Sequence, residues 1–264
     1  MAYNTLEHAS LWTANILTGL MASPLLSDGV TLNLDLEQTP GETIYPTTWS
    51  SFTVTNDTNC PTPGTAKTTS DVTQNKYPVT PSTYFIKIGF CAKDMFAMRT
   101  NVRNGLLDRL RLDMILDFES RVGTSLTAAI TTHTYGDTSS TITPEEFAAA
   151  KMYVQARSQG SDVIVGCSTA LMAGLISQAN IEMDPLLSGV TFIVSDQAFS
   201  NSANFIYPKN LFHYARLGGG IYFKEIADAG SGDDFTFLFH HFGLTALDEI
   251  DANAVKLITQ DTAN

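Results

Sequence analysis

The sequence predicts an α+β fold, and three stretches carry the prediction. Residues 94–123 have the spacing of one long helix. Residues 143–195 alternate between helix and strand patterns, and residues 221–242 have the pattern of a long β-hairpin. A chain of 264 residues can bury a substantial core, as one large domain or two modest ones.

The long helix is predicted from apolar side chains at every fourth position. These are Met98, Val102, Leu106, Leu110, Met114, Phe118 and Val122. A period of four overshoots the helical turn, so the apolar stripe drifts around the axis by roughly 40° per step. We therefore expect this helix, the spine of the fold, to meet different partners along its length. Arg109 with Asp113 and Asp117 with Arg121 are spaced to form ion pairs.

Composition restricts the possible functions. Acidic residues outnumber basic ones by 27 to 15, and the net charge of −12 argues against a protein that grips nucleic acid by its phosphates. No apolar run has the roughly 20 residues of a membrane span. The first residues lack the pattern of a signal peptide, so we expect folding in a cytoplasm. The widely spaced Cys60, Cys91 and Cys167 are typical of reduced structural thiols.

The first third of the chain is predicted to be an arm followed by a long loop. Residues 1–36 combine a short helix over 6–20 with an alternating strand at 30–36. Residues 37–83 hold six of the ten prolines and fourteen threonines, and their isolated apolar residues cannot build a core. An ordered conformation there requires outside support, which we expect from another copy of the chain. Residues 84–90 are the returning strand, so that 44–90 form one extended loop.

The rest of the chain follows from local signals. Strand pieces are expected at 126–132, around a turn at Gly136-Asp137. Thr143, Pro144 and Glu146 form a strong helix start, and this helix is expected to continue to about residue 158. A strand at 162–166, a helix from Ser168 to about 179 and a strand at 190–195 complete an α/β lobe. The hairpin strands at 221–226 and 235–242 flank a turn at 229–234, and 252–259 form the final strand.

Several residues invite a catalytic or metal-binding interpretation, and each has a simpler one. Cys167 and Ser168 lie at a strand-to-helix turn, but the G-x-S-x-G pattern fails at Ala170, and Ser168 suits a helix cap. His240 and His241 are adjacent on a strand and point to opposite faces. The acidic groups 233–234 and 248–251 lack calcium-loop spacing. We predict no catalytic, cofactor-binding or metal-binding residue.

The order of these parts resembles the major capsid protein of tailed bacteriophages, which has the Hong Kong 97-type fold. The resemblance covers essentially the whole chain. It rests on the spine at 94–123, the capped helix leading to DVIVG at 143–166, and GSGDDFTFLFHHFGLTALDEIDANAVKLIT at 230–259. Some members of that family cross-link subunits through a loop lysine. Lys67 and Lys76 lie in the matching region, but nothing identifies the asparagine or the acidic catalyst, so that chemistry is not transferred.

The resemblance implies a division into domains. Residues 1–36 would be the N-terminal arm, and residues 37–90 the extended loop with its flanking strands, lying over a neighbouring subunit. Residues 91–142 and 221–249, with the spine and the hairpin at 221–242, would form the peripheral domain. Residues 143–220 and 250–264 would form the axial domain. The family's long N-terminal scaffolding segment is missing here, so we expect either a separate scaffold or a mature chain.

The function that the resemblance implies is that of a structural virion protein. Hexamers and pentamers of this homo-oligomer would self-assemble into an icosahedral bacteriophage capsid around double-stranded DNA, built in the host cytoplasm. The expected partners are other copies of the chain, portal and scaffolding or decoration proteins, and DNA without sequence specificity, with no membrane. An encapsulin-like compartment that encloses a cargo is the alternative. A small cytosolic hydrolase using Cys167 or Ser168 is a more distant one.

Overall fold

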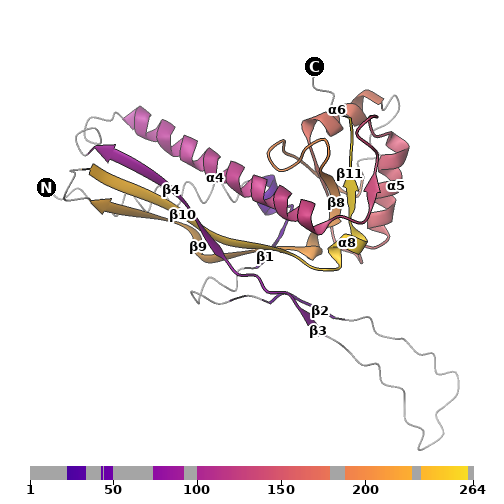
Figure 1. Cartoon of the computed structure of the whole chain (residues 1–264), viewed down its shortest axis with the longest axis horizontal. Helices are drawn as coiled ribbons and strands as arrows, with labels where there is room; N and C mark the ends of the chain where they lie inside the picture. The colour runs from indigo at the N-terminus through magenta and orange to yellow at the C-terminus, as the bar shows by residue number, and fades with distance from the viewer. Residues whose placement is uncertain are drawn as a thin grey trace, which may run out of the picture.

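The structure is a computed structural model, and it describes residues 23–33, 43, 45–49, 74–91, 100–178, 188–227 and 233–260. Two sheets share one long helix, α4 (Thr100–Ala129). Figure 1 shows α4 along one face of the first sheet, with the second sheet at the C-terminal end of the helix. Predicted features at residues 6–20, 34–36, 50–73, 94–99 and 229–232 lie outside the described residues. None of the described helices is long and apolar enough to cross a membrane.

The first sheet has four strands in the order β1-β9-β10-β4. They are β1 (Thr31–Asn33), β4 (Ser82–Cys91), β9 (Phe212–Ala227) and β10 (Asp233–Ala246). The hairpin β9–β10 is antiparallel, as predicted, and its strands are longer than expected at the end away from the turn. β4 pairs antiparallel with β10 over its whole length, which confirms the predicted returning strand.

The second sheet has five strands in the order β5-β11-β8-β6-β7. They are β5 (Thr134–Tyr135), β6 (Val163–Cys167), β7 (Thr191–Val194), β8 (Asn204–Pro208) and β11 (Val255–Leu257). The helices α5 (Pro144–Gln155) and α6 (Thr169–Gln178) contribute to the core on one face of this sheet. The short helix α2 (Pro24–Ser27) and α4 pack in the core on the other. A 3₁₀ turn, η2 (Lys209–Leu211), and α8 (Ile250–Asn253) complete the described elements.

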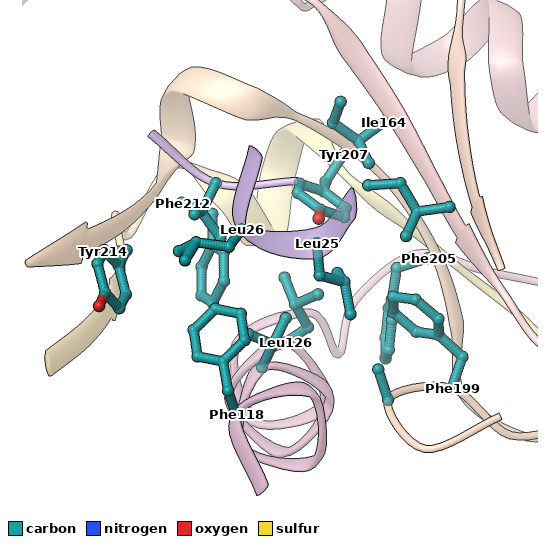
Figure 2. Close-up of a cluster of buried hydrophobic side chains, with 14 of the residues drawn as sticks. Leu25, Leu26, Phe118, Leu126, Ile164, Phe199, Phe205, Tyr207, Phe212 and Tyr214 are labelled. Carbon is teal, nitrogen blue, oxygen red and sulfur yellow. The ribbon is translucent and has the colours of Figure 1, made fainter. Parts of the chain in front are cut away.

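The spine helix confirms the second half of its predicted stripe and extends it, while the side chains of Met98, Val102 and Leu106 lie outside the described part of the chain. Leu110, Met114, Phe118 and Val122 are buried, and the same spacing continues through Leu126 to Ile130. Figure 2 shows Phe118 and Leu126 of α4 facing Leu25 and Leu26 of α2, with strand aromatics around them. The predicted ion pairs are present, Arg109–Asp113 at 2.9 Å and Arg121–Asp117 at 2.8 Å.

The strand pieces predicted at 126–132 are wrong, because α4 continues to Ala129. Threonines suggested a strand, but within the helix their hydroxyls have partners. Thr124 donates to the carbonyl oxygen of Ser120 at 2.9 Å, and Thr127 donates to that of Gly123 at 2.7 Å. Burial of Leu126 in the shared core then outweighs the modest strand preference of threonine.

Other local predictions differ in detail. The Thr143–Glu146 capping box is present at the start of α5, which ends at Gln155 rather than near 158. Gly136 has a φ of 78°, as a turn at this glycine requires. The strand expected over 252–259 is shorter, since residues 250–253 form α8 and only Val255–Leu257 pair in the sheet. No strand is predicted at β8, which is buried on both faces and therefore lacks an alternating pattern.

Two glycines of α4 make a matched test of the packing between the helix and the second sheet. A Cβ at Gly123 would lie 1.8 Å from the carbonyl oxygen of Ala198, whereas a Cβ at Gly105 would meet nothing within 4 Å. We expect Gly123→Ala to lower the free energy of unfolding by about 3 kcal/mol, because the helix must shift away from backbone. Gly105→Ala should leave it unchanged or raise it by up to about 1 kcal/mol. Urea denaturation of both variants measures the difference, and equal stabilities would contradict the close approach.

Candidate assembly interface

A two-stranded ribbon projects from the body of the molecule. Its strands are β2 (Thr47–Trp49) and β3 (Gln74–Lys76), which pair antiparallel with each other and with no other described strand. In Figure 1 the ribbon lies beyond the first sheet, on the side away from α4. Its described side chains, at Thr47, Gln74, Asn75 and Lys76, are all exposed. An isolated two-stranded ribbon is at best marginally stable in water.

The base of the ribbon is fixed to the body, and we call Pro46, Tyr77, Val79 and Thr80 its root. The backbone N–H of Tyr77 donates to the carbonyl oxygen of Pro46 at 3.0 Å, which brings the two ends of the ribbon together. Tyr77 and Val79 are buried, and Tyr77 belongs to the main core. A Cβ at Gly243 of β10 would lie 2.8 Å from the Val79 side chain, so the glycine lets the root approach the strand.

Apolar side chains are exposed on both sides of the root. Tyr45, one residue before the root, is 54% exposed, and Phe85 of β4 is 60% exposed. The Phe85 ring lies 6.1 Å from that of Phe239 on the sheet face away from α4. Large exposed aromatic side chains of this kind are enriched at protein–protein contacts.

The end of the predicted arm is tied to the spine and to the second sheet. The Glu119 carboxylate of α4 accepts hydrogen bonds from the hydroxyls of Ser23, at 3.2 Å, and Ser195, at 2.6 Å. The buried Tyr207 hydroxyl donates to the carbonyl oxygen of Gly29 at 2.9 Å. Residues 23–33 therefore form part of the folded body, and the arm has a fixed point of departure.

The structure gives Cys167 and Ser168 structural environments. Burial raises the pKa of the Cys167 thiol to about 12, with Asp196 adding to the effect, and a protonated thiol is a poor nucleophile. The Ser168 hydroxyl accepts from the N–H of Leu171 at 3.4 Å in the first turn of α6, as predicted for a cap. Asp196 caps the same turn by accepting from the N–H of Thr169 at 2.7 Å.

The remaining candidates are separated as well. His240 is fully buried, whereas His241 is half-buried and lies 2.8 Å from the Thr83 hydroxyl through its Nδ1, so the two rings face opposite sides of the sheet. Within the described ranges, no three His, Cys, Asp or Glu residues converge as metal ligands would. The side chains of Asp233 and Asp234 lie outside the described part of the chain.

Asp251, from the acidic group at 248–251, holds the chain that leaves α4. Its carboxylate accepts from the hydroxyl of Thr132 and from the backbone N–H groups of Thr131, at 2.6 Å, and Thr132, at 2.9 Å. The Thr132 hydroxyl, followed by the Thr131 N–H, lowers the pKa of Asp251 to about 2. This acidic residue therefore fastens α8 to the end of the spine.

The sequence predicts the loop but not the residues that anchor it. Val79 is one of the isolated apolar residues of the segment 37–83. The alternation of Tyr77 and Val79 around Pro78, between polar stretches, is the signal that marks the root. Its partner Gly243 is distant in sequence and carries no local signal.

No protein-family model matches this sequence, and no curated protein matches it. Solved structures do. The capsid of Ralstonia phage GP4 has a TM-score of 0.67 at 8% identity, over 89% of this chain and 88% of that one. The capsid of cyanophage P-SCSP1u has a TM-score of 0.63 at 10% identity, with coverages of 89% and 88%. A virus-like particle from Pyrococcus furiosus has a TM-score of 0.60 at 12% identity, with coverages of 95% and 99%. The chain therefore has the α+β, Hong Kong 97-type fold of phage capsid proteins, as predicted.

Asp251→Asn tests the fastening of α8. The amide presents a donor where the carboxylate accepts, so we expect the free energy of unfolding at pH 7 to fall by about 1 kcal/mol. Because the folded pKa of Asp251 lies below its ordinary value of 3.8, its contribution is present above pH 4 and is lost as the pH falls toward 2. Wild type and variant should therefore converge in acid. Asp248→Asn, at an exposed carboxylate, makes the same change in charge and should have little effect at either pH.

Proposed function

We propose that this chain is the major capsid protein of a bacteriophage, and that it self-assembles into hexamers and pentamers of an icosahedral head enclosing double-stranded DNA. The observation that carries the proposal is a ribbon whose root buries Tyr77 and Val79 while its described strand side chains are exposed. Together with a fold similar to phage capsids, this geometry favours a segment that is completed by a neighbouring copy.

The proposed assembly is held together by interface area and involves no bond chemistry. The loop 37–90 would lie over one neighbour and the arm 1–36 over another, burying surface that one subunit leaves exposed. Interfaces of ordinary size, about 1,600 Å² each, give a stable shell when each subunit makes several of them. The environments of Cys167 and Ser168 support a structural role rather than a catalytic one.

The two sheets correspond to two proposed domains of the subunit. We assign the spine and hairpin, in 91–142 and 221–249, to a peripheral domain, and 143–220 with 250–264 to an axial domain near the centre of each hexamer or pentamer. The net charge of −12 would let packaged DNA lie against the wall without tight binding. Portal, scaffolding or decoration proteins would be the other partners, in a shell assembled in the host cytoplasm.

An encapsulin-like compartment that encloses a cargo is the second candidate, favoured by the similarity to the Pyrococcus furiosus particle over nearly the whole of both chains. The two roles share the shell and differ in its content. Particles purified from their native source would contain DNA in the first case and a co-purifying protein in the second.

Removal of the ribbon is the direct test of assembly. Because Pro46 and Tyr77 are joined by a hydrogen bond, a short Gly-Ser linker can replace residues 47–76 without moving the root. Electron microscopy of the purified full chain should show shells or hexamers, and the deletion variant should show neither. Its melting temperature should stay within a few degrees of that of dissociated full-length subunits, since the core keeps Tyr77 and Val79. A full-length chain that stays monomeric at high concentration would exclude the shell role.

A further inference from the structure

The hairpin of the first sheet contains one large irregularity. Arg216 pairs with Phe242 on one side of it, and Ile221 pairs with His240 on the other. Residues 217–220 of β9 therefore stand opposite the single residue His241 of β10. Three of these four residues are glycines, at 218–220. A bulge of this size leaves β9 without a regular ladder at this level, and glycine gives its backbone unusual freedom.

The described outer strands of the sheet are distributed unevenly about the bulge. Within the described ranges, β1 pairs with residues 213–215 of β9, on one side of it, and β4 pairs with residues 233–242 of β10, almost wholly on the other. We call β1 with residues 212–216 and 242–246 the proximal limb. The distal limb is β4 with residues 221–227 and 233–240. Among the described strands, β10 continues from one limb to the other with β4 beside it as far as the Ser82–Phe242 pair, whereas β9 is bulged between the limbs, so the backbone of β9 resists bending least at this level.

The spine helix covers the bulge with an aromatic cluster. The Phe118 ring of α4 lies 5.6 Å from Tyr214 and 5.6 Å from Phe242 in the proximal limb, and 6.4 Å from His240 in the distal limb. His240 is fully buried in this cluster, with its Nε2 at 3.3 Å from the Tyr214 hydroxyl. Its Nδ1 has no hydrogen-bond partner among the described residues. A buried nitrogen without a partner costs free energy, so the unpaired Nδ1 destabilises the cluster that the ring helps to form.

The groups around His240 cannot stabilise a charge on its ring. Burial, then His241 and Arg121, lowers the pKa of His240 to about 3. The Arg121 guanidinium lies over the Tyr84 ring at 3.6 Å and is paired with Asp117. The groups that face the cluster are Arg121 with Asp117 from α4, Tyr214 and Arg216 from β9, His241 from β10, and Tyr84 from β4.

We propose that residues 217–220 are a hinge in the first sheet, and that the uncharged His240 ring locks it, so that acid releases the distal limb from α4. In the closed state the ring fills the aromatic cluster and bridges the two limbs. A protonated ring would lie beside Arg121, and no carboxylate from the described part of the chain pairs with it, so it leaves the cluster for water. The device is a property of the single chain and does not depend on the shell role.

The sign of the effect follows from linkage. His240 is held neutral in the closed state and titrates normally, near pH 6.5, once it is exposed. The closed state therefore keeps its full advantage above pH 6.5 and loses it as the pH falls toward 3. At pH 5 the ratio of closed to open molecules should be about 30-fold lower than at pH 7.5.

Amide hydrogen exchange at pH 7.5 and pH 5, corrected for the intrinsic exchange rate, tests the hinge. In the wild type we expect protection to fall in residues 82–91 and 233–240 at pH 5, while residues 163–167 and 204–208 of the second sheet keep theirs. The double variant His240→Phe with Tyr214→Phe keeps an aromatic cluster without a titrating ring, and without leaving the tyrosine hydroxyl unpaired. It should lose the pH dependence. His133→Gln, beyond the C-terminal end of α4, is the matched control and should behave as the wild type.

Two results would overturn the proposal. One is equal loss of protection in both sheets of the wild type, which would mean global acid unfolding rather than opening at the hinge. The other is the same pH dependence in the double variant as in the wild type. If the double variant does not fold, mass spectrometry of hydrogen exchange at the histidine C2 position of the wild type decides. His240 should remain neutral below pH 5, and an ordinary titration near pH 6.5 would refute the lock.

Discussion

The packing of one apolar stripe on α4 is the constraint on which the rest of the structure depends. From Leu110 to Ile130 the stripe turns slowly around the helix and so faces both sheets in succession. Phe118 meets the hairpin, and Gly123 meets the backbone at Ala198 beside the second sheet. Because a single core joins these contacts, neither sheet can move along the helix without opening a cavity under the other. Glu119 and Asp251 add polar ties at the same junction.

Features with a local signal were predictable from the sequence, and features made by distant pairings were not. The capping box at Thr143, the ion pairs of α4 and the hairpin depend on residues close in the chain, and all are present. The end of α4 was misplaced because threonine preference is weak beside the burial of Leu126. β8 was missed because a strand buried on both faces shows no alternation. The ribbon root depends on Gly243, more than a hundred residues from Val79. Composition could therefore indicate that the loop needs support, but not which residues provide it.

The molecule combines a folded body with segments whose exposed surface is unfavourable in an isolated chain. In a soluble monomer, exposed side chains such as Tyr45 and Phe85 and a self-paired ribbon would be liabilities for aggregation. In a protein that associates with its own copies, the same features supply affinity, provided that the body holds their starting points still. The buried Tyr77 and Val79, together with the arm fastened by Tyr207, meet that requirement.

The hydrogen bond between Tyr77 and Pro46 has a consequence for the peptide insertions that the chain can accept. It closes the long segment into a loop whose two ends meet at one point on the surface. The entropy of closing such a loop changes by only about 0.6 kcal/mol when its length doubles. Foreign peptides of very different sizes could therefore be grafted between these two residues while the scaffold beneath keeps its shape. The same tolerance would let related chains diverge freely in the length of this segment while keeping a common body.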